Sequence, residues 1–314
     1  MALFGRPKLE ELRAHNDRLS EELAEAHATI GRLKARLECL ESVPFPTRNI
    51  VWIFGSARTG STWLSLMMKD LAHHVRWSEP YVGAVFARVP DLDAGAGRLR
   101  KRAETIFGLP HRDVWRRSVR SVVLDGALAR FPSLDEESYL IVKEPNGSAG
   151  ASVLTEAFPE SRMILLVRDP RDVAASLIDS VRPGGWRERQ AGAVDPETVV
   201  RNGARSYLRN MTDAKRAFDA HEGPRTLVRY EELRADALGT MRGIYSELGI
   251  PASDGGLERA VEKHAWENIP AEKKGSGRPQ RKAQPGSWRE ELTPEQARIV
   301  EGITGPLLEA YYAG

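Results

Sequence analysis

The sequence predicts a three-layer α/β fold with a mostly parallel central sheet, preceded by an N-terminal coiled-coil helix. Apolar runs of strand length predict the sheet, and they lie near residues 50–54, 139–143, 163–168 and 226–229. The stretches between these runs are long and read as helical, and crossovers of that length join parallel strands. Polar turns follow the runs, which is typical of a sheet that binds ligands at the carboxyl ends of its strands.

Residues 9–40 carry an unbroken heptad pattern, in which apolar residues recur in alternating steps of three and four. With Leu9 at heptad position a, Asn16 is the lone polar residue at an a position, and asparagine there favours a parallel two-stranded coiled coil. Leucine and isoleucine at the other a positions leave a trimer open. The alternative to self-association is a single amphipathic helix packed on its own domain. We predict an oligomerisation helix over residues 1–43 and a homodimer.

Two prolines within residues 43–47 end this helix, because each lacks a backbone donor and constrains the residue before it. The rest of the chain is long enough for one large domain with a sizeable core. The sequence therefore divides at this linker, and we predict a second domain over residues 44–314.

The segment from Ile50 to Leu64 reads as an apolar strand, a glycine-bounded loop and the start of a helix. The N–H groups of such a loop and the helix N-terminus converge on one spot, which becomes an anion site. Gly55 and Gly60 keep the spacing of a nucleotide-triphosphate loop. However, Ser61 replaces the lysine that should follow, and Arg58 is the loop's only cation. A P-loop small-molecule kinase depends on that lysine and remains as an alternative.

The loop Arg58-Thr59-Gly60-Ser61-Thr62 resembles the 5′-phosphosulfate loop of the sulfotransferases that use 3′-phosphoadenosine 5′-phosphosulfate (PAPS). The resemblance continues in residues 163–177, where Arg168 and Ser176 match the arginine and serine that hold the 3′-phosphate. An arginine fork suits a phosphate dianion, because each charge-assisted hydrogen bond contributes about 1.5–3 kcal/mol. The resemblance thus implies that all of these residues bind the cofactor.

A third segment, residues 281–288, resembles the R-K-G-x-x-G-x-W segment that folds over the 3′-phosphate in this family. Arg281 and Lys282 carry its charge and are implied to bind the cofactor. Ala283 stands where the family usually has glycine, so the backbone contact expected there is in doubt. A solvated basic loop is the alternative interpretation of this segment by itself.

Two aromatic residues match those that hold the adenine in this family. Trp63 directly follows the loop, and Tyr230 lies in a Y-E-E-L segment after the last predicted strand. Either side chain could equally pack in the core. The resemblance places both among the cofactor-binding residues.

The resemblance implies transfer of a sulfuryl group from PAPS to an acceptor hydroxyl by in-line displacement, without a metal, leaving adenosine 3′,5′-bisphosphate (PAP). The acceptor needs a general base, which typically contributes a factor of about 10²–10⁴ in rate. The histidine base of the cytosolic phenol and steroid enzymes is absent after the strand at residues 139–143. Glu79, in Trp-Ser-Glu-Pro-Tyr, resembles the glutamate of the glycan-type enzymes and is implied to be the base.

Lys143 resembles the strand-end lysine that, together with Arg58, neutralises charge growing on the leaving phosphate. The implied catalytic residues are therefore Glu79, Arg58 and Lys143. Glu144 is the second candidate for the base, although successive side chains of a strand alternate faces and only one of the two should face the cleft. A glutamate near two cations is expected to be ionised at neutral pH.

No motif in the sequence identifies the acceptor. Residues 82–138 are rich in arginine, and in this family such insertions line the acceptor pocket; solvated helix faces are the plainer interpretation. The loop at residues 181–196 presents Trp186 and is either a lid over the acceptor or an ordinary loop. By analogy with the glycan-type enzymes, a glycan or another small carbohydrate-like or natural-product alcohol is favoured.

The composition predicts a cytoplasmic protein without nucleic-acid partners. Its 46 Lys and Arg nearly balance its 44 Asp and Glu, and this balance argues against general nucleic-acid binding. One cysteine excludes an intramolecular disulfide, and no apolar stretch has the length of a membrane span or a secretory signal. A third function, besides sulfotransferase and kinase, is a coiled-coil scaffold whose second domain binds PAPS without catalysis.

Overall fold

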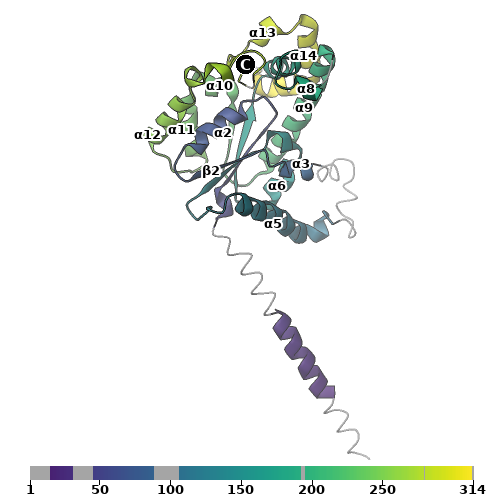
Figure 1. Cartoon of the computed structure of the whole chain (residues 1–314). Coiled ribbons are helices and arrows are strands. Elements are labelled where there is room, and N and C mark those ends of the chain that lie inside the picture. Colours follow the sequence, from purple (N-terminus) through teal and green to yellow (C-terminus); the bar gives the residue numbers. More distant parts are fainter. Residues whose placement is uncertain (1–14, 31–44, 88–105, 192–194, 279, 313–314) are drawn as a thin grey trace, which may run out of the picture. The chain divides into compact units, whose positions relative to one another are not determined.

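The computed structural model describes residues 15–30, 45–87, 106–191, 195–278 and 280–312. The chain divides into two units, Met1–Phe45 and Pro46–Gly314. In the first unit, residues 15–30 form a helix on which the apolar side chains of Leu19, Leu23 and Ile30 are exposed (Figure 1). The heptad positions at residues 9, 12, 33, 37 and 40 lie outside the described residues.

A five-stranded parallel sheet forms the centre of the second unit, with the strand order β2-β3-β1-β4-β5. The strands are β1 (Ile50–Gly55), β2 (His74–Ser78), β3 (Tyr139–Lys143), β4 (Arg162–Val167) and β5 (Arg225–Arg229). All but β2 are predicted from the sequence. The sequence signal of β2 is weak because this edge strand is only partly buried and has histidine and arginine among its apolar residues.

Helices cover both faces of the sheet (Figure 1). One face packs against α2 (Ser61–Lys69), α11 (Ala237–Glu247) and α12 (Asp254–Lys263). The other face packs against α9 (Pro196–Ala220), which also contacts α6 (Ala151–Ala157), α7 (Pro170–Val181) and α14 (Pro294–Tyr312). α5 (Arg112–Arg130) packs on α6. Because both faces are covered, β1 is buried along its whole length. The three layers and the parallel sheet confirm the predicted fold class.

Short helices complete the described chain. They are α3 (Val82–Val85), α8 (Glu188–Ala191), α10 (Tyr230–Ala235) and α13 (Trp288–Glu291), with the 3₁₀ turns η1 (Thr47–Asn49), η2 (Leu109–His111), η3 (Pro145–Gly150), η4 (Trp266–Asn268) and η5 (Ala271–Lys273). Within the described ranges, none of the helices is both long enough and apolar enough to cross a membrane.

Candidate active site

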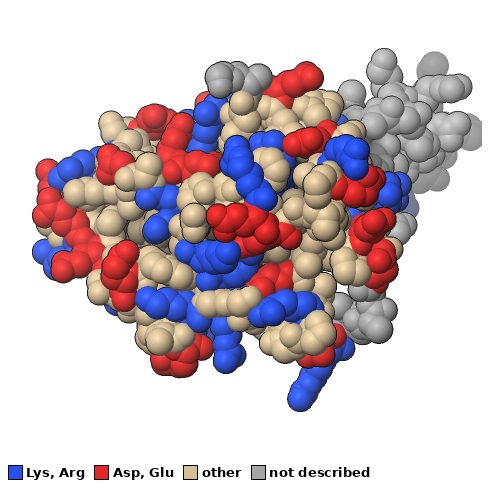
Figure 2. All heavy atoms as spheres, turned by 90° about the horizontal axis from the view of Figure 1, so that it is seen from above, with Lys and Arg blue, Asp and Glu red and all other residues tan. Residues whose placement is uncertain are grey.

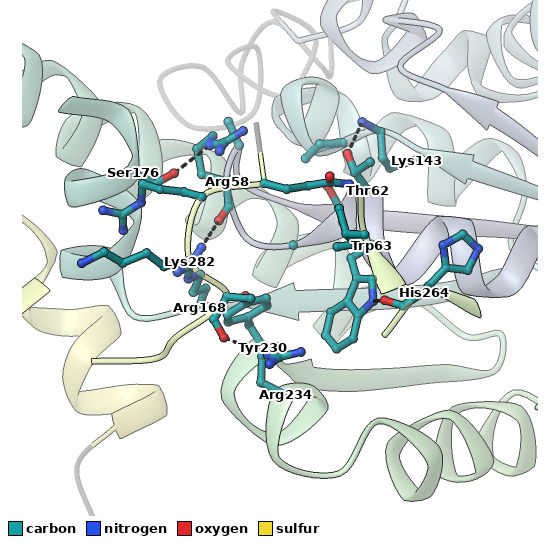
Figure 3. A pocket seen from close by; sticks show the side chains of 18 of the residues that line it. Arg58, Thr62, Trp63, Lys143, Arg168, Ser176, Tyr230, Arg234, His264 and Lys282 are labelled. Carbon is teal, nitrogen blue, oxygen red and sulfur yellow. Dashed lines mark hydrogen bonds between the residues drawn. The ribbon is translucent and has the colours of Figure 1, made fainter. Parts of the chain in front are cut away.

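A cavity of about 490 Å³ lies at the carboxyl ends of the strands (Figure 3). The cavity is lined by residues that follow or end each strand. They are residues 57, 58 and 60–63 in the loop and helix start after β1, Glu79 after β2, Lys143 at the end of β3, Arg168 after β4 and Tyr230 after β5. Ligands of parallel α/β sheets bind at this edge, as the polar turns in the sequence predict.

The cavity lining is strongly basic. Among the described residues that line it, seven are Lys or Arg and one is acidic: Arg58, Lys143, Arg168, Arg187, Arg234, Arg281 and Lys282, against Glu79. Figure 2 shows the molecule from above, with Lys and Arg side chains near the middle of the face and Asp and Glu side chains among them. Such a charge balance favours an anionic ligand.

The β1–α2 loop has a fixed backbone. Gly60 caps α2 in the left-handed conformation, with φ +94°, and a Cβ atom there would lie 2.5 Å from the Tyr230 ring. Thr59 Oγ1 donates a hydrogen bond to the Ser56 carbonyl at 2.8 Å. Arg58 has φ +70°, a conformation that costs an L-residue about 1–2 kcal/mol and must be maintained by its contacts. The loop and the α2 N-terminus therefore face the cavity as a preformed anion site.

Arg58 connects the loop to α7 and to the end of β4 (Figure 3). Its Nε donates to Ser176 Oγ at 2.9 Å, and its carbonyl accepts a hydrogen bond from Arg168 Nη1 at 2.9 Å. Burial and the positive charges of three neighbouring arginines, Arg168 among them, lower the pKa of Arg58 to about 10. An anion bound among these cations would relieve their mutual repulsion.

Two aromatic rings lie side by side in the cavity. The centroids of Trp63 and Tyr230 are 6.3 Å apart in an edge-to-face arrangement. The Trp63 indole donates to the His264 carbonyl at 2.8 Å, and the Arg234 guanidinium lies 5.2 Å from its ring. Tyr230 is only 6% exposed, and its ring packs 4.2 Å from the Arg168 guanidinium. Trp63 is thus the more accessible ring, while Tyr230 supports Arg168.

The C-terminal segment that carries Arg281 and Lys282 reaches the same cavity. Both side chains form ion pairs with Glu291. Ala283 has φ +54°, a left-handed conformation that glycine adopts freely and that costs an L-residue about 1–2 kcal/mol. Its carbonyl accepts a hydrogen bond from Arg234 Nε at 2.9 Å. The backbone at this position therefore has the conformation that favours glycine, although the residue is alanine.

Glu79 and Lys143 form an ion pair at the other end of the cavity. Lys143 Nζ contacts Oε1 of Glu79, while Asn146 Nδ2 at 2.8 Å and the Tyr81 hydroxyl at 3.1 Å donate to Oε2. Lys143 also donates to Thr62 Oγ1 at 3.4 Å (Figure 3). Burial opposes ionisation of Glu79, but the hydrogen bond and charge of Lys143 outweigh it and hold the pKa of Glu79 below its usual value.

Close backbone packing brings Glu79 to the end of β3. Gly83 in α3 lies so near η3 that a Cβ atom on it would overlap the Gly147 carbonyl, and a Cβ atom on Gly150 would overlap the Gly83 carbonyl. Glu79 and Tyr81 both have positive φ, at 52° and 60°. Non-glycine residues hold this conformation only where the surrounding structure enforces it.

Glu144 lies outside the cavity lining. Its side chain is fully buried, and its Oε2 accepts a hydrogen bond from the backbone N–H of Tyr81 at 3.0 Å. Burial raises the pKa of Glu144 to about 7. Lys143 lines the cavity and Glu144 does not, as strand alternation leads us to expect.

Comparison with known proteins identifies the family. The model of the sulfotransferase family matches residues 51–254, more than half of the chain. The chain belongs to the sulfotransferase family. No curated protein matches the sequence. Among solved structures, mouse sulfotransferase SULT7A1 complexed with PAP has the same fold, with a TM-score of 0.54 and 14% identity over 88% of this chain and 90% of that chain. Sulfotransferase STF9 from Mycobacterium avium has a TM-score of 0.52 and 16% identity over 90% of this chain and 81% of that chain.

The match confirms the predicted family and enzyme class. The structure of this sulfotransferase also brings the three predicted cofactor motifs to one cavity. Thr59 is the one predicted site residue outside the lining, because it is fully buried under the loop.

Sequence analysis missed several residues of the cavity. Arg187, Arg234, His264 and Trp266 line it without belonging to any of the motifs. Arg234 lies four residues after Tyr230 on α10, and this short helix was not predicted from the sequence. Arg187 and His264 lie in loops and Trp266 begins the 3₁₀ turn η4, and the sequence does not specify the course of these segments.

Two exposed aromatic residues line the cavity, and one of them, Tyr81, contacts Glu79. Tyr81 is 51% exposed and Trp186 is 44% exposed, and the Trp186 ring lies 5.5 Å from the Arg58 guanidinium. The described residues of the arginine-rich segment 82–138 do not line the cavity. Arg112 and Arg120 instead form ion pairs with glutamates of the α6 region, and residues 88–105 lie outside the described chain.

Proposed function

We propose that this sulfotransferase uses PAPS to transfer a sulfuryl group to an alcohol, with Glu79 as the general base. The observation that carries the proposal is the convergence of Arg58, Arg168 and the Arg281–Lys282 pair, from three distant segments, on one cavity. A structure with the same fold was solved in complex with PAP, which supports the choice of nucleotide.

The arginine side chains fit a doubly charged group. Arg168 Nε is buried and, within the described chain, has no hydrogen-bond partner. A phosphate oxygen would satisfy such a nitrogen, and its charge would offset the repulsion that lowers the pKa of Arg58. We assign the 3′-phosphate to Arg168, Ser176, Arg281 and Lys282, the 5′-phosphosulfate to residues 58–62, and the adenine to Trp63 and Tyr230.

Glu79 is the residue we assign to proton transfer. PAPS, when bound, supplies the sulfuryl group and an anionic leaving group. Glu79 is a carboxylate facing the cavity, and it takes the proton of the acceptor hydroxyl. Lys143 contacts both Glu79 and Thr62, so it links the base to the phosphate loop. Lys143 and Arg58 place fixed positive charge where negative charge develops.

For the acceptor we propose a carbohydrate-like or natural-product alcohol. Tyr81 offers an exposed ring beside the base, and Trp186 offers a second exposed ring in the same cavity, next to Arg58. Asn146 adds an exposed amide that already contacts Glu79. Flat apolar faces together with a few polar groups suit a ring that bears hydroxyls.

Calorimetric titration with PAP tests the cofactor assignment, with ATP and Mg²⁺ titrated in parallel. We expect the wild-type chain to bind PAP in preference to ATP. Arg168→Ala should weaken PAP binding by a factor of about 10–150, because the lost charge-assisted hydrogen bonds contribute about 1.5–3 kcal/mol.

Arg205→Ala is the matched control, because Arg205 is exposed on α9 and does not line the cavity. It should bind PAP as the wild-type chain does. Preferential ATP binding by the wild-type chain would overturn the assignment and favour a P-loop kinase.

We also propose that residues 1–43 form a parallel coiled coil and make the protein a homodimer. Leu19, Leu23 and Ile30 occupy heptad positions and are exposed in the single chain. A second copy would cover them, and Asn16 would fix the register.

Removal of residues 1–43 should convert the dimer to a monomer and leave PAP affinity unchanged, because the cavity lies wholly in the second unit. Light scattering measures the mass and calorimetry the affinity. In the full chain, Leu19→Asp should have the same effect, because it puts a charge in the apolar seam. A truncated protein that is still a dimer would refute the coiled-coil proposal.

A further inference from the structure

Asp172 is a fully buried carboxylate that the proposed chemistry does not use. It lies on α7, four residues after Arg168 and four before Ser176. Asp172 and Ser176 therefore share one face of α7, whereas Arg168 lies in the turn that precedes the helix. Asp172 therefore occupies the part of the chain that carries two of the proposed 3′-phosphate ligands.

The partners of Asp172 come from the C-terminal segment. Oδ2 accepts a hydrogen bond from the backbone N–H of Gly286 at 2.7 Å, and Oδ1 accepts one from Trp288 at 3.0 Å. Gly286 has φ +80°, a conformation that glycine adopts without strain. Both oxygens of one carboxylate thus hold the backbone just beyond Arg281 and Lys282.

Other contacts fix the same segment but do not replace this anchor. The Trp288 ring lies 4.2 Å from the Arg171 guanidinium, which extends the attachment to α7. Glu291 pairs with the side chains of Arg281 and Lys282 and holds their charged ends. The Asp172 carboxylate connects the backbone at Gly286 and Trp288 to α7, the helix that carries Ser176.

We infer that Asp172 is a positioning residue for recognition of the 3′-phosphate, an inference that rests on the proposed function. Through two backbone N–H groups it sets where Arg281 and Lys282 stand relative to Arg168 and Ser176. Its side chain is not part of the lining of this cavity and contributes no charge to it. Its loss should therefore affect nucleotides that carry a 3′-phosphate and spare those that do not.

Calorimetry with PAP and with adenosine 5′-monophosphate (AMP) tests this inference, because the two nucleotides differ only in the 3′-phosphate. Asp172→Asn keeps one carbonyl oxygen and loses the charge. We expect PAP affinity to fall about tenfold, the effect of one hydrogen bond to a charged group, while AMP affinity stays at the wild-type value. Gly286→Ala disturbs the same contact without altering a buried carboxylate, and it should show the same selective loss.

Asp195→Asn is the matched control. Asp195 also accepts a hydrogen bond from a backbone N–H, that of Thr198 at 2.9 Å, but it caps α9 and does not line the cavity. It should leave the PAP-to-AMP affinity ratio unchanged.

A double-mutant cycle separates positioning from general packing. If Asp172 acts through Arg281 and Lys282, then Asp172→Asn should have little further effect on PAP affinity once both are alanine. An additive loss, or an equal fall in PAP and AMP affinity, would overturn the inference. A wild-type chain that does not prefer PAP over AMP would instead count against the proposed function.

Discussion

Glu79→Gln should lower the rate of sulfuryl transfer by a factor of about 10²–10⁴ and leave PAP affinity unchanged. Glutamine keeps the shape of the side chain and an oxygen for Lys143, but it cannot take up the proton of the acceptor. The nucleotide ligands lie in other segments, so binding should not respond. Turnover is measured with labelled PAPS and an acceptor found by screening, and binding is measured by calorimetry.

The pH dependence of the same reaction follows from the surroundings of Glu79. Burial disfavours its charged form, yet Lys143, Asn146 and Tyr81 hold its pKa below the usual value. Glu79 is therefore ionised throughout the neutral range, and the wild-type rate should fall only below the usual pKa of a glutamate. A base with a low pKa is a weak base, so its effectiveness depends on its position next to the acceptor.

Two comparisons make the Glu79 result decisive. Glu247→Gln removes an exposed carboxylate at the end of α11 and should turn over at the wild-type rate. Full activity in Glu79→Gln would refute the base assignment. A wild-type chain that binds PAP but transfers sulfate to no acceptor would favour the non-catalytic scaffold.

The cofactor motifs were predictable because each is a short continuous segment. The fold then brings these segments together at the carboxyl edge of the sheet. Arg58 and Arg168 each follow an apolar run, and in a parallel sheet the carboxyl ends of neighbouring strands meet. β1 and β4 are indeed paired, so the two arginines come together although 110 residues separate them. The strand pattern and the polar turns predict a ligand site at this edge of the sheet, and the resemblance to the PAPS sulfotransferases assigns both arginines to it.

The surroundings of the base were not predictable in the same way. The position of Glu79 depends on positive φ values at Glu79 and Tyr81 and on the contact of Gly83 with η3. None of these has a sequence signature as strong as a strand or a loop motif. Asp172 was missed for a related reason, because its partners are backbone N–H groups more than a hundred residues away.

Glu144 should make the protein less stable as the pH rises from about 4.5 to 7. Burial raises the pKa of Glu144 to about 7 in the folded chain, whereas an unfolded chain leaves it near its ordinary value of 4.5. Between these values the folded state binds more protons than the unfolded state, so the free energy of unfolding falls as the pH increases. The difference in pKa corresponds to about 3 kcal/mol, fully present below pH 4.5 and lost above pH 7.

Glu144→Gln isolates this contribution, because glutamine stays neutral at every pH. We expect the free energy of unfolding of the wild-type chain, measured with urea at pH 5 and pH 8, to fall by up to about 3 kcal/mol more than that of the variant.

Glu231 also has its pKa raised by burial, but it is present in both chains and its effect cancels in the comparison. The lowered pKa of Glu79 makes the free energy of unfolding rise with pH, but this rise lies below pH 4.5 and outside the measured range. Glu247→Gln should keep the wild-type pH dependence, and the same pH dependence in Glu144→Gln would show that the buried carboxyl does not titrate as proposed.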